Sequence, residues 1–174
     1  MTTDLAYPIG KFQRPTVLTA DDRTAAIAHF AALPGEIRGA VQGLSEAQLD
    51  TPYRPGGWSV RQVVHHLADS HLNALIRVKL ALTEENPAIK PYDEKQWAEL
   101  ADSRLPVPPS LAILEGVHAR LVAVLSAMPA EAFTRPLLHP VSGPQTIDTV
   151  VALYSWHGRH HLAHITGLRQ REGW

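Results

Sequence analysis

The chain has 174 residues, a length that predicts one domain over residues 1–174 with room for a buried core. Its formal net charge of −1 shows no excess of basic residues for binding phosphates, so we expect no nucleic-acid partner. The absence of cysteine excludes disulfides and thiolate ligands and is compatible with a cytoplasmic address. No run of about 18 apolar residues and no secretory signal pattern occurs, so we expect no membrane partner.

The first twenty residues are predicted to be extended, because Pro8 and Pro15 interrupt any helix there. The first helix is expected to start near Thr19–Asp22, where a hydroxyl or carboxylate can cap it, and to run to about residue 43. Pro34-Gly35 is a point at which this helix could break.

A short helical turn is predicted from Ser45 to Leu49, since Ser45 and Gln48 have capping-box spacing. After a Pro- and Gly-rich turn at residues 52–57, the second helix is expected from a cap at Ser59 to about Leu82.

Residues 84–109 form a long proline-bearing connection, in which a short helix is expected near Asp93–Leu100. A crossover of this length would let the third helix, predicted over about Ser110–Met128, run parallel to the second. We expect the connection to flank either the mouth of a functional site or a dimer interface, with Tyr92 and Trp97 as its anchors.

Residues 134–145 hold three prolines and are predicted to be a loop, and the fourth helix is expected from about Thr146 to Arg171. Strand patterns are nearly absent. Four amphipathic helices joined with one long crossover predict an all-α four-helix bundle.

Histidines gather on one face of the fourth helix. His157 and His161 continue its apolar stripe, so they should face the bundle interior and could hold one metal ion together. His160 and His164 are rotated by roughly 60° from them and should lie at the flank. The spacing alone leaves open whether the inward pair binds a metal or is hydrogen-bonded in the core. The stripe reads Ile147, Val150, Tyr154, His157, His161, Ile165 and Leu168.

A third ligand should come from a facing helix, because catalytic zinc sites commonly use three protein ligands and an open position. The second helix offers His65, His66 and His71, and periodicity does not separate the first two. His118, alone on the apolar stripe of the third helix, is expected to have a structural role or to orient a ligand imidazole. His66 lies on a polar line with Gln62, Asp69, Asn73 and Arg77, which is either a solvated face or the lining of a pocket.

Longer segments of the chain resemble the DinB superfamily of metal-binding four-helix bundles. The likeness is closest to a branch of YfiT-like proteins described as metal-dependent hydrolases and bacillithiol S-transferases. It rests on Trp58 followed after seven residues by His66, and on the later pair His157 and His161. The stretches that carry it are YPIG at 7–10, LDTPYRPGGWSVRQVVHHLADSH at 49–71, NALIRVKLALTEENPAIKPYDEKQWAEL at 73–100 and YSWHGRHHLAHI at 154–165.

The resemblance implies an up-down-down-up bundle with a long crossover between the second and third helices, and a homodimer. It also implies His66, His157 and His161 as ligands of one divalent metal ion per chain, zinc or nickel. This implication selects His66 over His65. The wider superfamily includes enzymes that join a low-molecular-weight thiol, such as bacillithiol or mycothiol, to an electrophile.

Three hypotheses of function follow from an open three-histidine site. The first is an S-transferase that joins a bacillithiol-like thiol to electrophiles, with Arg77, Arg159 or Lys90 binding acidic groups of the thiol. The second is a metal-dependent hydrolase that uses a metal-bound water, with Asp69 or His160 moving the proton and a small hydrolysable substrate. The third is a metal-stabilised dimeric bundle without catalysis, which would need a fourth ligand.

Overall fold

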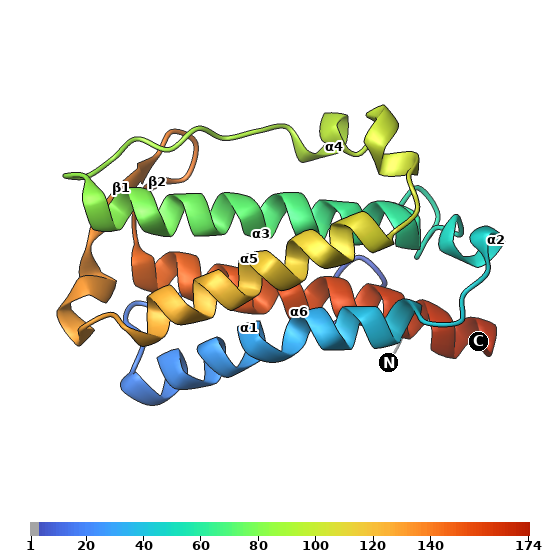
Figure 1. Ribbon diagram of the computed structural model, residues 1–174, viewed down its shortest axis with the longest axis horizontal. Coiled ribbons are helices and arrows are strands. Elements are labelled where there is room, and N and C mark those ends of the chain that lie inside the picture. The colour runs from blue at the N-terminus through green and yellow to red at the C-terminus, as the bar shows by residue number, and fades with distance from the viewer. Residues whose placement is uncertain (1–3) are drawn as a thin grey trace.

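The computed structural model describes residues 4–174 as a four-helix bundle (Figure 1). Within that range four long helices form the bundle: α1 (Ala20–Val41), α3 (Val60–Thr83), α5 (Pro108–Ser126) and α6 (Ile147–Glu172). The colour gradient shows that α1 and α6 run in one direction and that α3 and α5 run in the other. The up-down-down-up topology and the parallel α3 and α5 are therefore confirmed.

Side-chain caps start the helices where the sequence predicted them. Thr19 and Ser59 each form a capping box, with Asp22 and Gln62 as the partners three residues on. The short helix α2 (Glu46–Leu49) is capped in the same way by Ser45. These local bonds satisfy backbone N–H groups that the first turn of a helix leaves without an acceptor.

The helix α1 does not break at Pro34, which was considered a break point. Pro34 lies inside the helix, and Leu33 and Ile37 on either side of it are buried in the core. Proline removes one helical hydrogen bond, but the packing of this apolar face keeps the backbone helical through the position.

The crossover lies along the outside of α3 (Figure 1). It contains the short helix α4 (Glu94–Trp97), as predicted, and a 3₁₀ turn, η1 (Ala101–Arg104). The Gln62 side chain donates from Nε2 to the Ala98 carbonyl at 2.9 Å, which ties the crossover to α3 near its N-terminus.

The prediction of a loop over residues 134–145 was wrong. After a second 3₁₀ turn, η2 (Ala130–Thr134), the chain forms an antiparallel hairpin of β1 (Pro136–His139) and β2 (Gly143–Thr146). Local sequence hides it because each strand has four residues and prolines interrupt the pattern. Distant contacts stabilise it: Leu137 is fully buried, and Leu138 exchanges backbone hydrogen bonds with Pro87 and Ile89 of the crossover.

The buried apolar residues form two clusters, one toward each end of the bundle. One surrounds Phe30 and Tyr154, and the other surrounds Leu33 and Ile165. His160, His161 and His164 lie between the residues of the two clusters on α6, and His71 does so on α3. The bundle therefore has a polar layer across its middle, and every group in that layer must find a hydrogen-bond partner or a ligand.

Among the helices that the structure describes, α5 has the length and composition that a membrane span needs. Buried core helices pass the same test, and α5 packs between α1 and α3. A place in the bundle core accounts for its apolar character.

Candidate metal site

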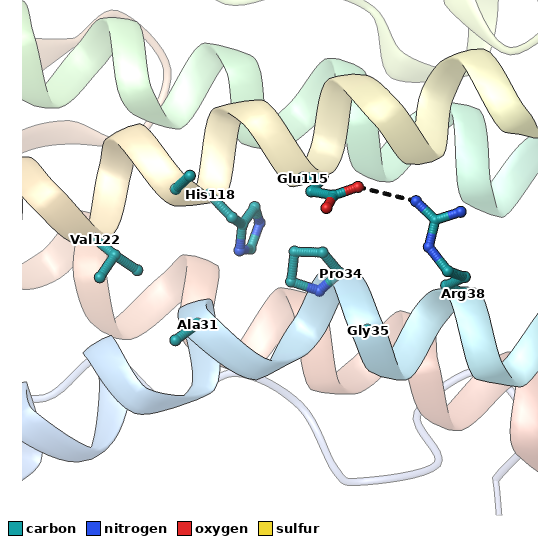
Figure 2. Close-up of a pocket in the computed structure, with 8 residues that line it drawn as sticks. Ala31, Pro34, Gly35, Arg38, Glu115, His118 and Val122 are labelled. Carbon is teal, nitrogen blue, oxygen red and sulfur yellow. Dashed lines mark hydrogen bonds and ion pairs between the residues drawn. The ribbon is translucent and has the colours of Figure 1, made fainter.

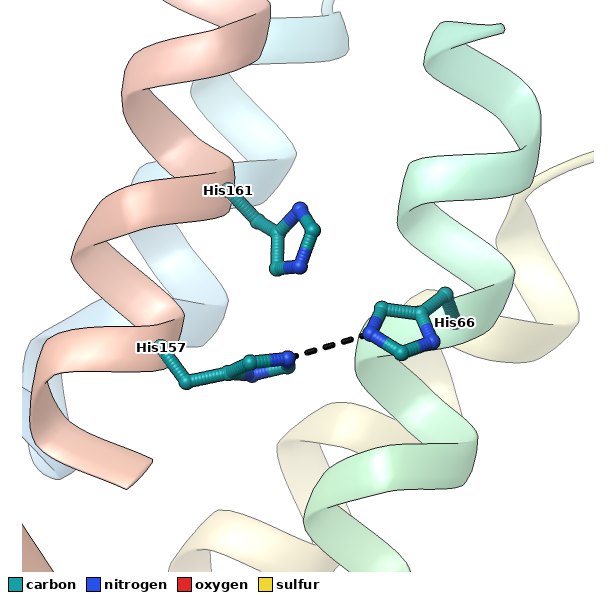
Figure 3. A group of neighbouring side chains, drawn as sticks. All are labelled: His66, His157 and His161. Carbon is teal, nitrogen blue, oxygen red and sulfur yellow. Dashed lines mark hydrogen bonds between the residues drawn. The ribbon is translucent and has the colours of Figure 1, made fainter. Parts of the chain in front are cut away.

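Three imidazoles from two helices converge on one point. His66 comes from α3, and His157 and His161 lie one turn apart on α6 (Figure 3). The Nε2 atoms of His66 and His157 are 3.0 Å apart, and one nitrogen of each of the three rings lies within 4.8 Å of the others. The structure thus brings together the three residues that the sequence and the resemblance singled out.

This arrangement fits a metal ion. Zinc–imidazole bonds of about 2.0–2.1 Å place two ligand nitrogens roughly 2.9–3.4 Å apart for bond angles between square and tetrahedral. The observed 3.0 Å between His66 and His157 lies in this interval. This distance is compatible with both zinc and nickel, because the bond angles that the two ions prefer both fall within this interval.

The three rings are also neutral, which is the form that binds metals. Burial, followed by the neighbouring His160, lowers the pKa of His66 to about 4. Burial, followed by the other histidines of the cluster, holds the pKa of His157 and of His161 well below the ordinary value. At neutral pH each ring therefore carries a free nitrogen lone pair.

His65 points away from this cluster. Its Nδ1 lies 2.7 Å from the Ser110 hydroxyl, and its Nε2 lies 2.9 Å from the Leu105 carbonyl. Both nitrogens are occupied on the α5 side of α3. His66 faces the opposite side, where its ring packs against Trp58 with centroids 4.6 Å apart. The geometry thus resolves the tie between the two neighbours.

His160 and His164, expected at the flank of α6, are buried, with 7% and 3% of their surface exposed. Residues far away in sequence cover them. His164 stacks on Tyr53 with centroids 3.8 Å apart, while His160 stacks on Trp156 at 4.4 Å and lies 6.0 Å from Tyr7. Trp156 lies on α6 itself, but Tyr7 comes from the N-terminal segment and Tyr53 from the turn after α2, so helix periodicity alone could not show this burial.

The two flanking histidines contact the cluster differently. His164 Nδ1 lies 3.3 Å from His161 Nδ1, so the opposite nitrogen of His161, Nε2, is left to face the other two rings. His160 packs edge-on against His161 with centroids 5.0 Å apart. Among the described residues, Nδ1 of His160 and Nε2 of His164 are buried without a hydrogen-bond partner.

His71 and His118 lie behind His157, deeper in the bundle. His118 Nδ1 is 2.6 Å from the Phe30 carbonyl, His118 Nε2 is 2.9 Å from His71 Nδ1, and His71 Nε2 is 3.3 Å from His157 Nδ1. Both ring nitrogens of His118 therefore have hydrogen-bond partners within the bundle, which agrees with the structural or ligand-orienting role expected for it.

A wide mouth opens above the three imidazoles, with a cavity volume of about 1,100 Å³. Residues 94–100 of the crossover form one rim, so the prediction that this connection flanks a mouth is confirmed. Tyr92 and Trp97 pack together there with centroids 4.4 Å apart. Trp58 and Gln62, which the sequence singled out, line the walls. The walls also hold side chains that the sequence did not single out, namely Tyr7, Tyr53, Arg54, Glu94, Lys95, Gln96, Glu99 and Trp156.

Three of the five candidates for proton transfer or substrate binding lie in different places. His160 lines the mouth. Asp69 is half-buried outside the mouth lining, and burial, followed by the charge of Asp102, raises its pKa to about 6. Arg77 lies eleven positions after His66, about 16 Å further along α3, and its Nη1 donates to the Tyr154 hydroxyl at 2.8 Å. The structure therefore brings His160, and neither Asp69 nor Arg77, to the mouth.

Comparison with known proteins defines the family. Residues 29–165 match the model of the DinB superfamily, and the chain belongs to this superfamily. It is 51% identical over 171 residues to a Bacillus cereus protein and to a Bacillus thuringiensis protein, covering 98% of this chain and 99% of each relative. Both relatives carry the provisional name metal-dependent hydrolase. The predicted family is confirmed.

The fold comparison agrees with the sequence comparison. YfiT from Bacillus subtilis superposes with a TM-score of 0.94 at 46% identity, over 98% of both chains. It is described as a metal-dependent hydrolase, again provisionally, with an unusual four-helix bundle topology. The four-helix bundle protein TT2238 matches 83% of this chain with a TM-score of 0.56 at 20% identity, a likeness of fold alone. The predicted fold class is confirmed.

Proposed function

We propose that the protein is a metal-dependent enzyme that holds one divalent cation, zinc or nickel, through His66, His157 and His161. The observation that carries the proposal is the convergence of three neutral imidazoles at the floor of an open mouth. A divalent cation bound there acidifies water or a thiol and so supplies a nucleophile at neutral pH. The names of the relatives support metal dependence.

An open site is favoured over a closed, purely structural one. A structural zinc site normally has four protein ligands, and His164 is the residue best placed to be a fourth. Its Nδ1, however, contacts Nδ1 of His161, on the side of that ring opposite Nε2. With His164 behind the ring, the side that faces the mouth stays accessible to a small molecule.

Thiol transfer is the first reaction we propose. Known ligand cavities span about 300–1,000 Å³, so a mouth of about 1,100 Å³ has room for two reactants. Arg54 and Lys95 line it and can pair with carboxylates of a small thiol. In this reaction the thiol gives its proton to the solvent and its sulfur bonds to the electrophilic carbon. Either a halide ion leaves, or the epoxide ring opens and its oxygen takes up a proton.

Hydrolysis is the second candidate, favoured by the names of the relatives. His160 is the residue that would move the proton, because it lines the mouth and packs against His161. Its Nδ1 is buried without a hydrogen-bond partner among the described residues, so a substrate or water would have to enter beside the ring to reach it.

The test uses untagged protein loaded with zinc or with nickel. One assay follows conjugation of a small thiol to an alkyl halide or an epoxide, and the other follows cleavage of a panel of esters and amides. We expect conjugation that requires the metal and is lost in His161→Ala but kept in His29→Ala, an exposed histidine outside the cluster. Metal-dependent cleavage without conjugation would select the hydrolase. Bound metal without turnover in either assay would contradict an enzyme.

Two further expectations belong to this proposal. The family resemblance implies a homodimer, which light scattering of the purified protein would test. It also leaves a cytoplasmic address as the expected location, which fractionation of the source cells would test.

A further inference from the structure

A row of three imidazoles connects the mouth with the groove between α1 and α5. It begins at the Phe30 carbonyl and passes through His118 and His71 to His157. Figure 2 shows the outer end, where His118 projects from α5 towards α1 beside Pro34. That groove has a cavity volume of about 310 Å³.

Pro34 explains why a carbonyl is available at this depth. In an α-helix the N–H of residue 34 would donate to the carbonyl of residue 30, but proline has no N–H. The Phe30 carbonyl inside α1 therefore lacks its helical donor, and Nδ1 of His118 reaches it at 2.6 Å. The proline that failed to break the helix instead provides a fixed acceptor for a buried side chain.

The acceptor sets the direction of every hydrogen bond that follows. A carbonyl oxygen can only accept, so His118 must carry its proton on Nδ1. A neutral imidazole then has a bare Nε2, which must accept from Nδ1–H of His71. By the same step, Nε2 of His71 accepts from Nδ1–H of His157. The last ring is left with its lone pair on Nε2, the atom 3.0 Å from His66 Nε2.

These hydrogen-bond directions require neutral rings, and the buried surroundings keep the rings neutral. His71 is fully buried and His118 is 1% exposed. The rings that pack against them are Phe30, Tyr154 and the neighbouring histidines. Burial accordingly lowers the pKa of both, and the neighbouring histidines lower that of His71 further.

We propose that His118 and His71 are positioning residues that fix His157 as its Nδ1–H tautomer, and thereby hold its Nε2 lone pair toward the mouth before any metal arrives. This deepens the proposed function, because it relies on His157 being a ligand. The metal-free protein then needs no rearrangement of this ring on binding. A partner that orients a ligand imidazole is commonly worth about 10- to 100-fold in metal affinity.

The first test reads the tautomers directly in the metal-free wild type. Long-range proton–nitrogen correlation spectra of protein with labelled histidine distinguish Nδ1–H from Nε2–H rings at neutral pH. We expect Nδ1–H in His118, in His71 and in His157. An Nε2–H ring at any of these three positions would overturn the proposal. This readout involves neither metal nor activity, so it stands even if the proposed function fails.

The second test compares two replacements of His71 by zinc competition against a chelator. In His71→Gln the amide oxygen can still accept from Nδ1–H of His157, whereas His71→Leu offers no acceptor. We expect the Leu variant to bind zinc about 10- to 100-fold more weakly than wild type and the Gln variant to stay within about threefold. His29→Leu is the control and should bind as wild type.

Each outcome of the second test has a distinct meaning. Equal zinc affinity of wild type and His71→Leu would overturn the proposal. An equal loss of zinc affinity in both His71 variants would also overturn it, because ring packing and not the hydrogen-bond acceptor would then matter. A wild type that binds no zinc would contradict the proposed function, while the tautomer spectra would still decide the inference.

Discussion

At Gly158 α6 packs tightly against Leu33 of α1, and Gly158→Ala tests this contact. A Cβ there would lie 2.4 Å from Cδ2 and 3.3 Å from Cδ1 of Leu33, and 3.5 Å from Cε1 of His71. Carbon atoms prefer about 3.5–4.0 Å, so Leu33 or the helix must move by about 1 Å. Overpacking of this kind costs about 1–3 kcal/mol, and the better helix propensity of alanine returns up to about 1 kcal/mol.

Gly116 provides the matched control. It also lies inside a helix, and a Cβ there would meet nothing within 4 Å. Gly116→Ala should therefore gain about 1 kcal/mol, while Gly158→Ala should lose about 1 kcal/mol. At about 2–4 °C per kcal/mol for a chain of this length, the two melting temperatures should differ by about 6 °C.

Thermal and urea unfolding of the metal-free variants measure this difference. A double mutant should also show the contact, because Leu33→Ala must cost about 1 kcal/mol less in the Gly158→Ala background than in wild type. If Gly158→Ala were as stable as Gly116→Ala, the close approach of α6 to α1 beside His157 would be wrong.

Three further predictions concern charges. The pKa of His66 is about 4 when folded and 6.5 when unfolded, so the unfolded chain binds more protons between these values. As pH falls from 6.5 to 4, His66 alone should cost the metal-free protein about 3 kcal/mol, and the other buried histidines add to this loss. A flat urea midpoint would contradict this. The pKa of Asp69 is raised to about 6, so its contribution to stability is highest in acid and falls as pH rises through that value. After allowance for solvent screening, Asp69→Asn should add about 1 kcal/mol at pH 8 and nothing near pH 3.5, measured as the difference in urea midpoints. Arg61→Met should cost about 2 kcal/mol in thermal unfolding because Arg61, 5% exposed, donates to Asp50, Glu46 and the Leu105 carbonyl; an unchanged melting temperature would show that these bonds do not stabilise the fold.

Local patterns were enough to predict the bundle. The caps at Ser59 and Thr19 are set by side chains within three residues, and the fourth helix has a continuous stripe that places His157 and His161 together. Short-range hydrogen bonds and helix period govern these features, so the sequence encodes them within a few residues.

Features that depend on distant partners were not predictable in the same way. The hairpin of β1 and β2 relies on the burial of Leu137 and on backbone bonds to the crossover. The choice between His65 and His66 depends on Ser110, forty-five residues away from His65. The burial of His164 depends on Tyr53. Each of these outcomes is a tertiary contact that helix periodicity does not contain.

The row from Phe30 to His157 combines both kinds of information. Pro34 is visible in the sequence, and a proline inside a helix is known to free a carbonyl. That His118 reaches this carbonyl and that His71 reaches His118 emerges only when α1, α3 and α5 pack together. A proline inside a predicted helix, with a lone histidine on the apolar face of another, is the signal that could have suggested it.

The most direct test of the three-histidine metal site is the metal stoichiometry of untagged protein. Elemental analysis and zinc titration would be made on wild type, on His66→Ala, His157→Ala and His161→Ala, and on the control His29→Ala. With His66, His157 and His161 as ligands, we predict about one equivalent of zinc or nickel per chain in wild type and in the control, and loss of that metal in each of the other three variants. A wild type that takes up no zinc or nickel, or a His161→Ala variant that keeps a full equivalent, would contradict it.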